Sequence, residues 1–249
     1  ARPLVTRIHG RYYDLGGFSH PGGCPALECA RDRDATALFE SYHALHRDLP
    51  AKVLRRYELD PEEAAAAGRR FDGEQAVEAA DVAEVDWIET LASPFRADLL
   101  ACARRYFEEE QRRRGLRRFG EATRAPLRRW LEVAVLGALF FAALVALLRG
   151  SWPALLAAPA LGWLFLVNFW HDALHFAMSP SWRLNAALPY LFPWFISPKL
   201  WMHQHVIGHH VSPNHPLRDP DVRAALPVLR QTPGVPWCPR HAAQRHLPW

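Results

Sequence analysis

Cysteine is scarce in this chain of 249 residues, and no two of its four cysteines form a Cys-x-x-Cys pair. This absence excludes a disulfide-stabilised scaffold and a zinc ribbon, and it fits a reducing compartment. There is also no initiator methionine and no basic-plus-apolar leader, so no signal peptide is visible and we expect the chain to begin inside a longer protein. Because 50% of the residues are hydrophobic and 22% are charged, a disordered or collagen-like polymer is excluded as well. The four cysteines are Cys24, Cys29, Cys102 and Cys238.

Charge is absent from two long segments. Residues 133–148 carry none, and residues 152–170 form a second uncharged run of 19 residues. Each run approaches the ~20 apolar residues that a helix needs to cross a bilayer core. Because only residues 149–151 separate the runs, we predict a tight membrane-spanning helical hairpin. The alternative is a pair of helices buried in a soluble core, which we disfavour because such helices rarely lack a polar face over about four turns.

Positive charge is concentrated in one place. The formal net charge of +4 and the isoelectric point near 9.1 are compatible with nucleic-acid binding. However, arginines gather directly before the first apolar run, which favours membrane lipids as the partner and no nucleic acid. By the positive-inside tendency, we expect this arginine cluster on the cytoplasmic side. Its members are Arg112, Arg113, Arg114, Arg117, Arg118, Arg124, Arg128 and Arg129.

Changes in composition divide the chain into three parts. Residues 1–59 are predicted to form a small α+β domain, with a strand over residues 4–8 and a later helix capped by Asp34. Residues 60–124 are rich in alanine, glutamate and arginine and are predicted to be a charged, solvated helical linker. Residues 125–249 are predicted to form an all-α membrane domain, in which interfacial helices follow the hairpin.

Histidine is abundant, with 13 residues, and seven of them lie between His171 and His215. Five of the seven form a His-x-x-x-His group and a His-x-x-x-His-His group, namely His171 and His175, then His205, His209 and His210. Histidines four residues apart share one face of a helix, and neutral imidazole is a ligand for iron, copper and zinc. A His-Glu-x-x-His zinc protease is disfavoured because Asp172, and not a glutamate, follows His171.

Both histidine groups are expected on one side of the membrane. If the arginine cluster is cytoplasmic, the second apolar run returns the chain to that side just before His171. A third apolar stretch, residues 185–198, is too short and too rich in proline to span, and its tryptophans suit the interface. His205 then follows on the same side, so the two groups are predicted to meet at one metal centre.

These histidines resemble the first two histidine boxes of the membrane fatty acid desaturase and hydroxylase family. The first box is residues 168–175, Asn-Phe-Trp-His-Asp-Ala-Leu-His, and the second is residues 201–210, Trp-Met-His-Gln-His-Val-Ile-Gly-His-His. Asn214 and the Asp-Pro-Asp of residues 219–221 are similar to the residues that follow in the family. The resemblance implies two iron ions that activate O2 to remove hydrogens from an acyl chain. The ligands that it implies are His171, His175, His205, His209 and His210, whereas His203 and His215 have no clear counterpart and are assigned only as neighbours.

The N-terminal module resembles cytochrome b5. Residues 13–23, Tyr-Asp-Leu-Gly-Gly-Phe-Ser-His-Pro-Gly-Gly, are similar to its haem loop, and residues 34–43 are similar to its second ligand region. Imidazoles on both faces of a haem let the iron pass one electron with little rearrangement. The resemblance implies haem b with His20 and His43 as axial ligands and with Pro21, Gly22 and Gly23 in the loop. His46 is the alternative to His43, because the spacing is one residue shorter than in the soluble cytochrome.

A cytochrome b5 head before the boxes is the arrangement of front-end acyl and sphingolipid desaturases. It implies a relay in which an NADH-cytochrome b5 reductase reduces the haem, the haem passes electrons to the di-iron site, and O2 is reduced as a double bond forms. The expected setting is polyunsaturated fatty acid biosynthesis at the cytoplasmic face of the endoplasmic reticulum. The alternatives are a hydroxylase with the same boxes, a membrane-tethered haem carrier without catalysis, and a zinc or copper membrane protein.

One part of the family pattern is absent from the chain. The resemblance covers residues 4–59 and 125–249, but the third box of the family, Gln-x-x-His-His, has no counterpart, since residues 244–246 read Gln-Arg-His. We therefore expect an incomplete fragment that is inactive alone, with a truncated, inactive relative as the alternative.

Overall fold

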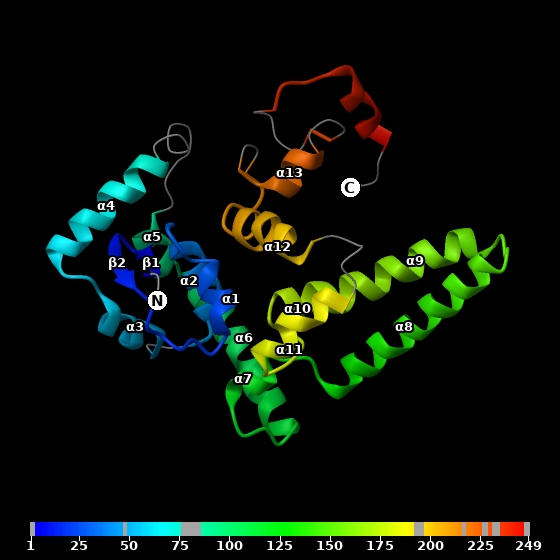
Figure 1. Ribbon diagram of the computed structural model, residues 1–249, viewed down its shortest axis with the longest axis horizontal. Helices are drawn as coiled ribbons and strands as arrows, with labels where there is room; N and C mark the ends of the chain where they lie inside the picture. The colour runs from blue at the N-terminus through cyan, green and yellow to red at the C-terminus, as the bar shows by residue number, and fades with distance from the viewer. Residues whose placement is uncertain are drawn as a thin grey trace. The chain divides into compact units, whose positions relative to one another are not determined.

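The computed structural model describes residues 3–46, 49–75, 86–191, 197–215, 218–225, 229–230 and 235–246. The chain forms two compact units, and each is described by itself. One contains residues 1–17, 27–76 and 194–249, and the other contains residues 18–26 and 77–193. Among the described residues, helices account for most of the regular structure, and the strands form one two-stranded sheet near the N-terminus (Figure 1).

A β-hairpin opens the first unit. β1 (Val5–Ile8) and β2 (Arg11–Asp14) pair antiparallel, with Val5 opposite Asp14. His9 and Gly10 between them have φ of 50° and 74°, and a two-residue hairpin loop often needs such left-handed conformations at both positions. The strand predicted over residues 4–8 is confirmed, and the turn supplies its partner strand.

Asp34 connects the hairpin to the helix that follows. Its Oδ1 accepts a hydrogen bond from the backbone N–H of Thr36 (2.9 Å), and its Oδ2 accepts one from Arg7 Nε on β1 (3.0 Å). The helix, α2, spans Thr36–His43, so it begins two residues after Asp34 and its N-cap position is Ala35. The carboxylate still satisfies an N–H of the first turn that has no partner within the helix, as an N-terminal cap does.

The rest of this unit is helical in its described residues. The helices after α2 are α3 (Leu49–Leu54), the 3-10 turn η1 (Arg55–Tyr57) and α4 (Pro61–Gln75). Ala67 of α4 is buried beside Val5 of β1, and Tyr12 and Leu59 pack around them. The C-terminal elements are α12 (Pro198–Trp201), the π-helix η5 (Met202–His209), α13 (Pro220–Ala225) and the 3-10 helix η6 (Pro239–His246).

The described part of the second unit contains helices and connecting segments. Its first helix, α1 (Gly23–Glu28), begins after the loop at residues 18–22. The later elements are α5 (Trp87–Ala92), α6 (Pro94–Arg113), α7 (Phe119–Ala122), α8 (Leu127–Leu148), α9 (Ala154–Leu166), the π-helix η3 (Val167–His171), α10 (Asp172–Leu174), α11 (Trp182–Ala187) and the 3-10 turn η4 (Leu188–Leu191). The linker predicted between residues 60 and 124 is therefore mostly helical where it is described, and residues 76–85 lie outside the described residues.

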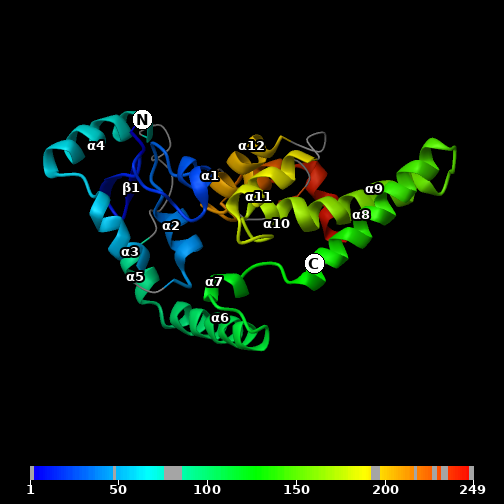
Figure 2. The same ribbon diagram turned by 60° about the horizontal axis from the view of Figure 1, so that its bottom comes forward.

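α8 and α9 form the predicted helical hairpin and run side by side in both views (Figure 1, Figure 2). Glycines allow their close approach. A Cβ at Gly137 of α8 would lie 2.9 Å from Phe165 Cε2, and a Cβ at Gly162 of α9 would lie 2.9 Å from Phe140 Cε2. On each helix, a glycine thus leaves room for a phenylalanine ring of the other helix. Small residues at such contacts are typical of helices that pack within lipid.

Two helices among the described residues are long and apolar enough to cross a membrane, Phe119–Leu148 and Ala154–Leu174. In the most apolar window of the first, only 11% of the residues are buried. A core helix of a soluble domain buries most of its apolar surface against other elements. The outward-facing apolar surface therefore favours the membrane interpretation over a soluble core.

The third apolar stretch contains only short elements where it is described. α11 and η4 cover its first residues, and residues 192–196 lie outside the described part. Asn185 of α11 is almost fully buried; its Oδ1 accepts the N–H of Ser179 (2.9 Å), and its Nδ2 donates to Phe176 O (3.2 Å). These bonds tie α11 to the end of α10. An interfacial position of this stretch stays a prediction.

Replacing Gly137 with valine is expected to destabilise the hairpin by about 1–3 kcal/mol, because the added atoms overlap with Phe165. The midpoint of thermal unfolding of the chain in a mild detergent measures this change. Val135→Phe is the matched control, since it adds bulk to the same helix at a side chain that is 58% exposed. An equal loss of stability in both variants would contradict this account of the packing.

Candidate functional site

The second histidine group lies on a π-helix, η5. The His210 N–H donates to His205 O, five residues earlier (3.0 Å), which is the spacing of a π-helical hydrogen bond. The ring centroid of His205 lies 5.1 Å from that of His209 and 4.8 Å from that of His210. The three rings therefore lie together, although on a π-helix and not on the α-helix that the spacing predicts.

Two aspartates hold the Nδ1 atoms of this group. His205 Nδ1 donates to Asp221 Oδ2 (3.0 Å), and His209 Nδ1 donates to Asp219 Oδ2 (2.8 Å). A carboxylate at Nδ1 keeps the hydrogen of a neutral imidazole on that atom and leaves the Nε2 lone pair for a metal. The Asp-Pro-Asp segment thus orients two of the predicted ligands.

Asp219 is the more deeply placed of the two carboxylates. It is fully buried (0% exposed) and accepts further hydrogen bonds from the backbone N–H groups of Asn214 (2.7 Å) and Asp221 (2.9 Å). Burial alone raises the pKa of Asp219, but the hydrogen bonds from His209 and the backbone outweigh burial and lower this pKa below its ordinary value. Asp219 is therefore an anion at neutral pH.

The geometry on the Nε2 side of this group fits a metal ion. His205 Nε2 and His210 Nε2 are 3.2 Å apart. Two nitrogens that each lie about 2.1 Å from one ion are separated by about 3.0–3.2 Å when the angle at the ion is about 90–100°. In a second arrangement, His205, His209 and Asp221 would bind an ion directly, but this would break the bonds from Nδ1 to the carboxylates. Imidazoles backed by carboxylates are a suitable donor set for iron.

The first histidine group ends the second helix of the hairpin. The His175 N–H donates to His171 O (3.1 Å), and the two ring centroids are 4.5 Å apart. His171 Nδ1 lies 3.2 Å from Asp172 Oδ1, and Asp172 Oδ2 accepts a hydrogen bond from Arg129 Nη2 (3.0 Å). Because Arg129 is in the first turn of α8, the beginning of the hairpin and the first histidine group lie at the same end, as the topological argument predicts.

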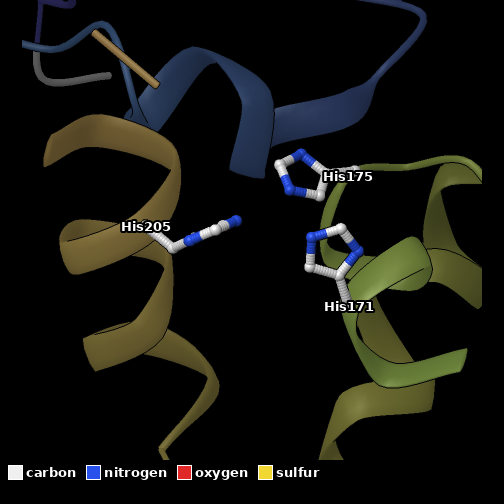
Figure 3. A group of neighbouring side chains, drawn as sticks. All are labelled: His171, His175 and His205. Carbon is white, nitrogen blue, oxygen red and sulfur yellow. The ribbon is translucent and has the colours of Figure 1, made fainter. Parts of the chain in front are cut away.

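The predicted site residues are distributed over both units. Figure 3 draws His171 and His175 on the segment from η3 to the end of α10, and it draws His205 on η5. The first group belongs to one unit and the second to the other, so their meeting at one metal centre stays a prediction. Of the two assigned neighbours, His203 is exposed on η5, and His215 Nδ1 accepts the N–H of Arg218 (3.1 Å).

His43 has the surroundings that an axial haem ligand needs. Its Nδ1 donates to Phe39 O (2.9 Å), and the two rings lie 4.8 Å apart, so Nε2 presents its lone pair. Burial is the largest influence on the pKa of His43 and lowers it, which keeps the ring neutral at pH 7. His46, the alternative ligand, is exposed at the end of the following turn, with its ring centroid 6.2 Å from that of His43. These features favour His43.

Glycines shape the loop that carries His20. A Cβ at Gly22 would lie 2.9 Å from His20 Nδ1, and Gly23 has a φ of 72°, which favours glycine. The Gly22 N–H donates to His20 Nδ1 (2.9 Å), which places the hydrogen of the neutral ring on Nε2. Haem binding through His20 Nε2 therefore requires this bond to break. Because His20 and His43 belong to different units, their pairing across one haem also stays a prediction.

The orienting role of three carboxylates was missed in the sequence. In the sequence, Asp172 serves only to disfavour a protease, and Asp219 and Asp221 enter only through the resemblance. The available signal was chemical, because metal-bound histidines usually donate their second ring N–H to a carboxylate or a carbonyl. An aspartate beside the first group and two shortly after the second satisfy that need.

Replacing His43 with alanine is expected to abolish the Soret band and the low-spin spectrum of the chain after reconstitution with haemin, because one axial nitrogen is lost. The matched control is His46→Ala, which should retain both spectral features. Loss of the Soret band in His46→Ala with retention in His43→Ala would reverse the assignment.

Replacing Asp221 with alanine is expected to weaken the binding of Co²⁺ to the chain by about 10- to 100-fold, because His205 loses the group that orients it. Asp221→Asn keeps an acceptor oxygen at Nδ1 and should lose less affinity. A titration followed by the visible absorption of Co²⁺ measures both variants, and their thermal midpoints report on folding. Unchanged affinity in Asp221→Ala would contradict the orienting role.

Two family models match separate parts of the chain. Residues 150–249 match the family model of the fatty acid desaturases, and residues 2–60 match that of the cytochrome b5-like haem/steroid binding domain. No solved structure matches the chain.

Curated relatives match almost the whole chain. It is 30% identical to an acyl-lipid (7-3)-desaturase of Rebecca salina. The alignment is 256 residues long and covers 99% of the chain and 48% of that relative. It is 29% identical to a probable Delta(5) fatty acid desaturase C of Dictyostelium discoideum, over 86% of the chain and 43% of the relative. An acyl-lipid omega-13 desaturase of Chlamydomonas reinhardtii is 30% identical over 91% of the chain and 48% of its own length. The chain spans about half the length of the relatives that it matches.

Proposed function

We propose that the protein containing this chain desaturates a lipid acyl chain with O2. Residues 150–249 match the fatty acid desaturases and residues 2–60 match the cytochrome b5-like domain, which supports this proposal. The observation that carries this proposal is the pair of histidine groups in which the Nδ1 atoms of His171, His205 and His209 face carboxylates. A carboxylate at Nδ1 makes Nε2 the metal-binding atom of each of these imidazoles, as the ligands of a non-haem iron centre require.

The proposed reaction removes two hydrogens from adjacent carbons and forms a double bond between them. O2 accepts four electrons and becomes two molecules of water; two electrons come from the two C–H bonds and two come from the haem, together with two protons. When bound, the two irons supply the oxidation of the unactivated C–H bonds, which no amino-acid side chain can perform.

In this proposal, residues of the chain hold and orient the metal centre. His171, His175, His205, His209 and His210 are the proposed ligands. Asp172, Asp219 and Asp221 fix the rings, and Arg129 neutralises Asp172 at the end of the hairpin (3.0 Å). The ligands beyond these five imidazoles would come from the part of the family's length that this chain does not span.

The cytochrome b5-like domain is the proposed source of electrons. In this role His20 and His43 bind haem b, beside the loop of Pro21, Gly22 and Gly23, and the domain receives electrons from an NADH-cytochrome b5 reductase. Covalent attachment raises the effective concentration of the electron donor to roughly millimolar. This attachment makes transfer to the iron centre intramolecular.

The membrane is the proposed location of the reaction. The apolar hairpin α8–α9 would place the histidine groups at one surface of the bilayer, where acyl chains are available. We assign that surface to the cytoplasmic side because Arg129 of the arginine cluster bonds Asp172, the neighbour of His171. The endoplasmic reticulum is the membrane that the resemblance to front-end desaturases implies.

Expression of the complete coding sequence in yeast, followed by analysis of fatty acid products, tests the proposal. The unaltered protein is expected to form a new double bond, whereas His171→Ala and His205→Ala should each lower product formation by at least about 10³-fold, because the iron centre loses a ligand. His20→Ala should abolish product as well.

The outcomes of this experiment separate the alternatives. A hydroxylated product would identify a hydroxylase. Full function of the variants at positions 171 and 205, with loss only in His20→Ala, would identify a haem carrier. Purified protein without iron beyond the haem would favour a zinc or copper protein.

A further inference from the structure

An apolar stripe runs along the outside of α6, in the region predicted to be a solvated linker. Phe95, Leu99 and Tyr106 are 77%, 55% and 60% exposed, and Cys102 between them is exposed as well. Spacings of four, three and four residues place these side chains on one face of an α-helix. Across the short connection at Ser93, the preceding helix α5 adds Ile88, which is 85% exposed.

The stripe is distinct from the face by which α6 packs in its own unit. On that face the Phe107 ring lies 6.4 Å from the ring of Phe119 on α7, and the Arg104 guanidinium lies 5.6 Å from the centre of the same ring. One face of α6 therefore packs against α7, and the four side chains of the stripe lie on a different, exposed face of α6.

Hydrogen bonds attach this region to the end of the hairpin. Arg124 Nη1 donates to Phe176 O (2.6 Å), and the Ala125 N–H donates to Ala177 O (2.9 Å). These bonds join the residues just before α8 to those just after α10. Because α7 lies only a few residues before α8, α6 is held near the end of the hairpin where the arginine cluster gathers.

The charge of the region is complementary to anionic lipid. Residues 94–118 contain eight arginines and four acidic residues, and one of the acids, Glu110, is paired with Arg113 (2.7 Å). A helix with an apolar stripe beside excess arginine is typical of segments that lie flat in the headgroup region of a membrane.

From the exposed stripe, the excess of arginine and the attachment to the hairpin, we propose that α6 is an interfacial anchor. In this arrangement the stripe of Phe95, Leu99, Cys102 and Tyr106 lies in the headgroup–acyl boundary of the leaflet that α8 enters. The arginines contact anionic headgroups. The proposal concerns a lipid surface and does not depend on the reaction that the protein catalyses.

Cys102 makes the stripe directly testable. A nitroxide attached to Cys102 is compared with one at Ala101→Cys in a Cys102→Ala background, because Ala101 is exposed but faces away from the stripe. Both proteins carry Cys24→Ser and Cys238→Ser. Cys29 can be retained, because it is buried and its burial raises the pKa of the thiol to about 11. The same chain with Cys102→Ala and no added cysteine measures any background labelling.

The full chain is reconstituted into phosphatidylcholine vesicles with about 30% phosphatidylglycerol, and the collision rates of each nitroxide with O2 and with a water-soluble nickel chelate are measured. At position 102 the ratio of O2 to nickel collisions should exceed that at position 101 by about tenfold, since O2 concentrates in lipid and the chelate stays in water. Equal, water-like ratios at both positions would overturn the proposal. Low collision rates of position 102 with both reagents would also overturn it, because they would show that protein covers the stripe.

A pair of charge substitutions gives a second readout. Leu99→Glu places a carboxylate in the stripe and should return the nitroxide at Cys102 to a water-like ratio, whereas Ala97→Glu, on an exposed position outside the stripe, should leave the ratio unchanged. Vesicles of phosphatidylcholine alone should lower the ratio at Cys102 in the otherwise unaltered chain. An identical response of the two glutamate variants would contradict the assignment of the stripe to lipid.

Discussion

A neutral imidazole has one nitrogen lone pair to offer a metal, and the site of that lone pair depends on where its single hydrogen is held. In the described structure, an oxygen faces the Nδ1 of four histidines assigned as ligands: Phe39 O at His43, Asp172 at His171, Asp221 at His205 and Asp219 at His209. The backbone carbonyl suits a haem ligand, which needs only orientation. The carboxylates also raise the basicity of the rings, which suits a more highly charged non-haem centre.

The same constraint explains why the helices depart from α geometry where the histidines lie. The π-helical segment η3 ends at His171, and η5 contains His205 and His209. Such segments occur frequently at functional sites. In η5 the wider turn brings His210 Nε2 to 3.2 Å from His205 Nε2, although an ideal α-helix offsets residues five apart by more than a quarter of a turn. The change from α- to π-helical hydrogen bonds thus brings together ring nitrogens that are predicted to bind metal.

The sequence predicted features that repeat over many residues and missed those that depend on one turn. The apolar runs follow from such long patterns. The strand at residues 4–8 follows instead from its local content of β-branched and apolar residues. The pairing of His205 with His209 follows from their four-residue spacing. A π-helix leaves no periodic signal, so the approach of His210 to His205 could not be derived in the same way. The exposed stripe of α6 was missed for a different reason, since arginines between Leu99 and Tyr106 make the average composition polar and hide the apolar face. The contact between Gly137 and Phe165 could not be predicted from the sequence, because it depends on the register of α8 against α9.

An interfacial position of α6 would reduce the volume that the haem domain, linked covalently to the membrane domain, can sample. Only 11 residues separate Gln75 at the end of α4 from Trp87 at the start of α5, and such a segment reaches at most about 40 Å when fully extended. If α6 were free in solution, its own length would add to the volume that the haem domain samples. With α6 held flat at the bilayer surface, the distance that the haem domain could travel from the start of α5 would be set by this short segment alone. The effective concentration of the electron donor would then rise, as the proposed electron relay requires.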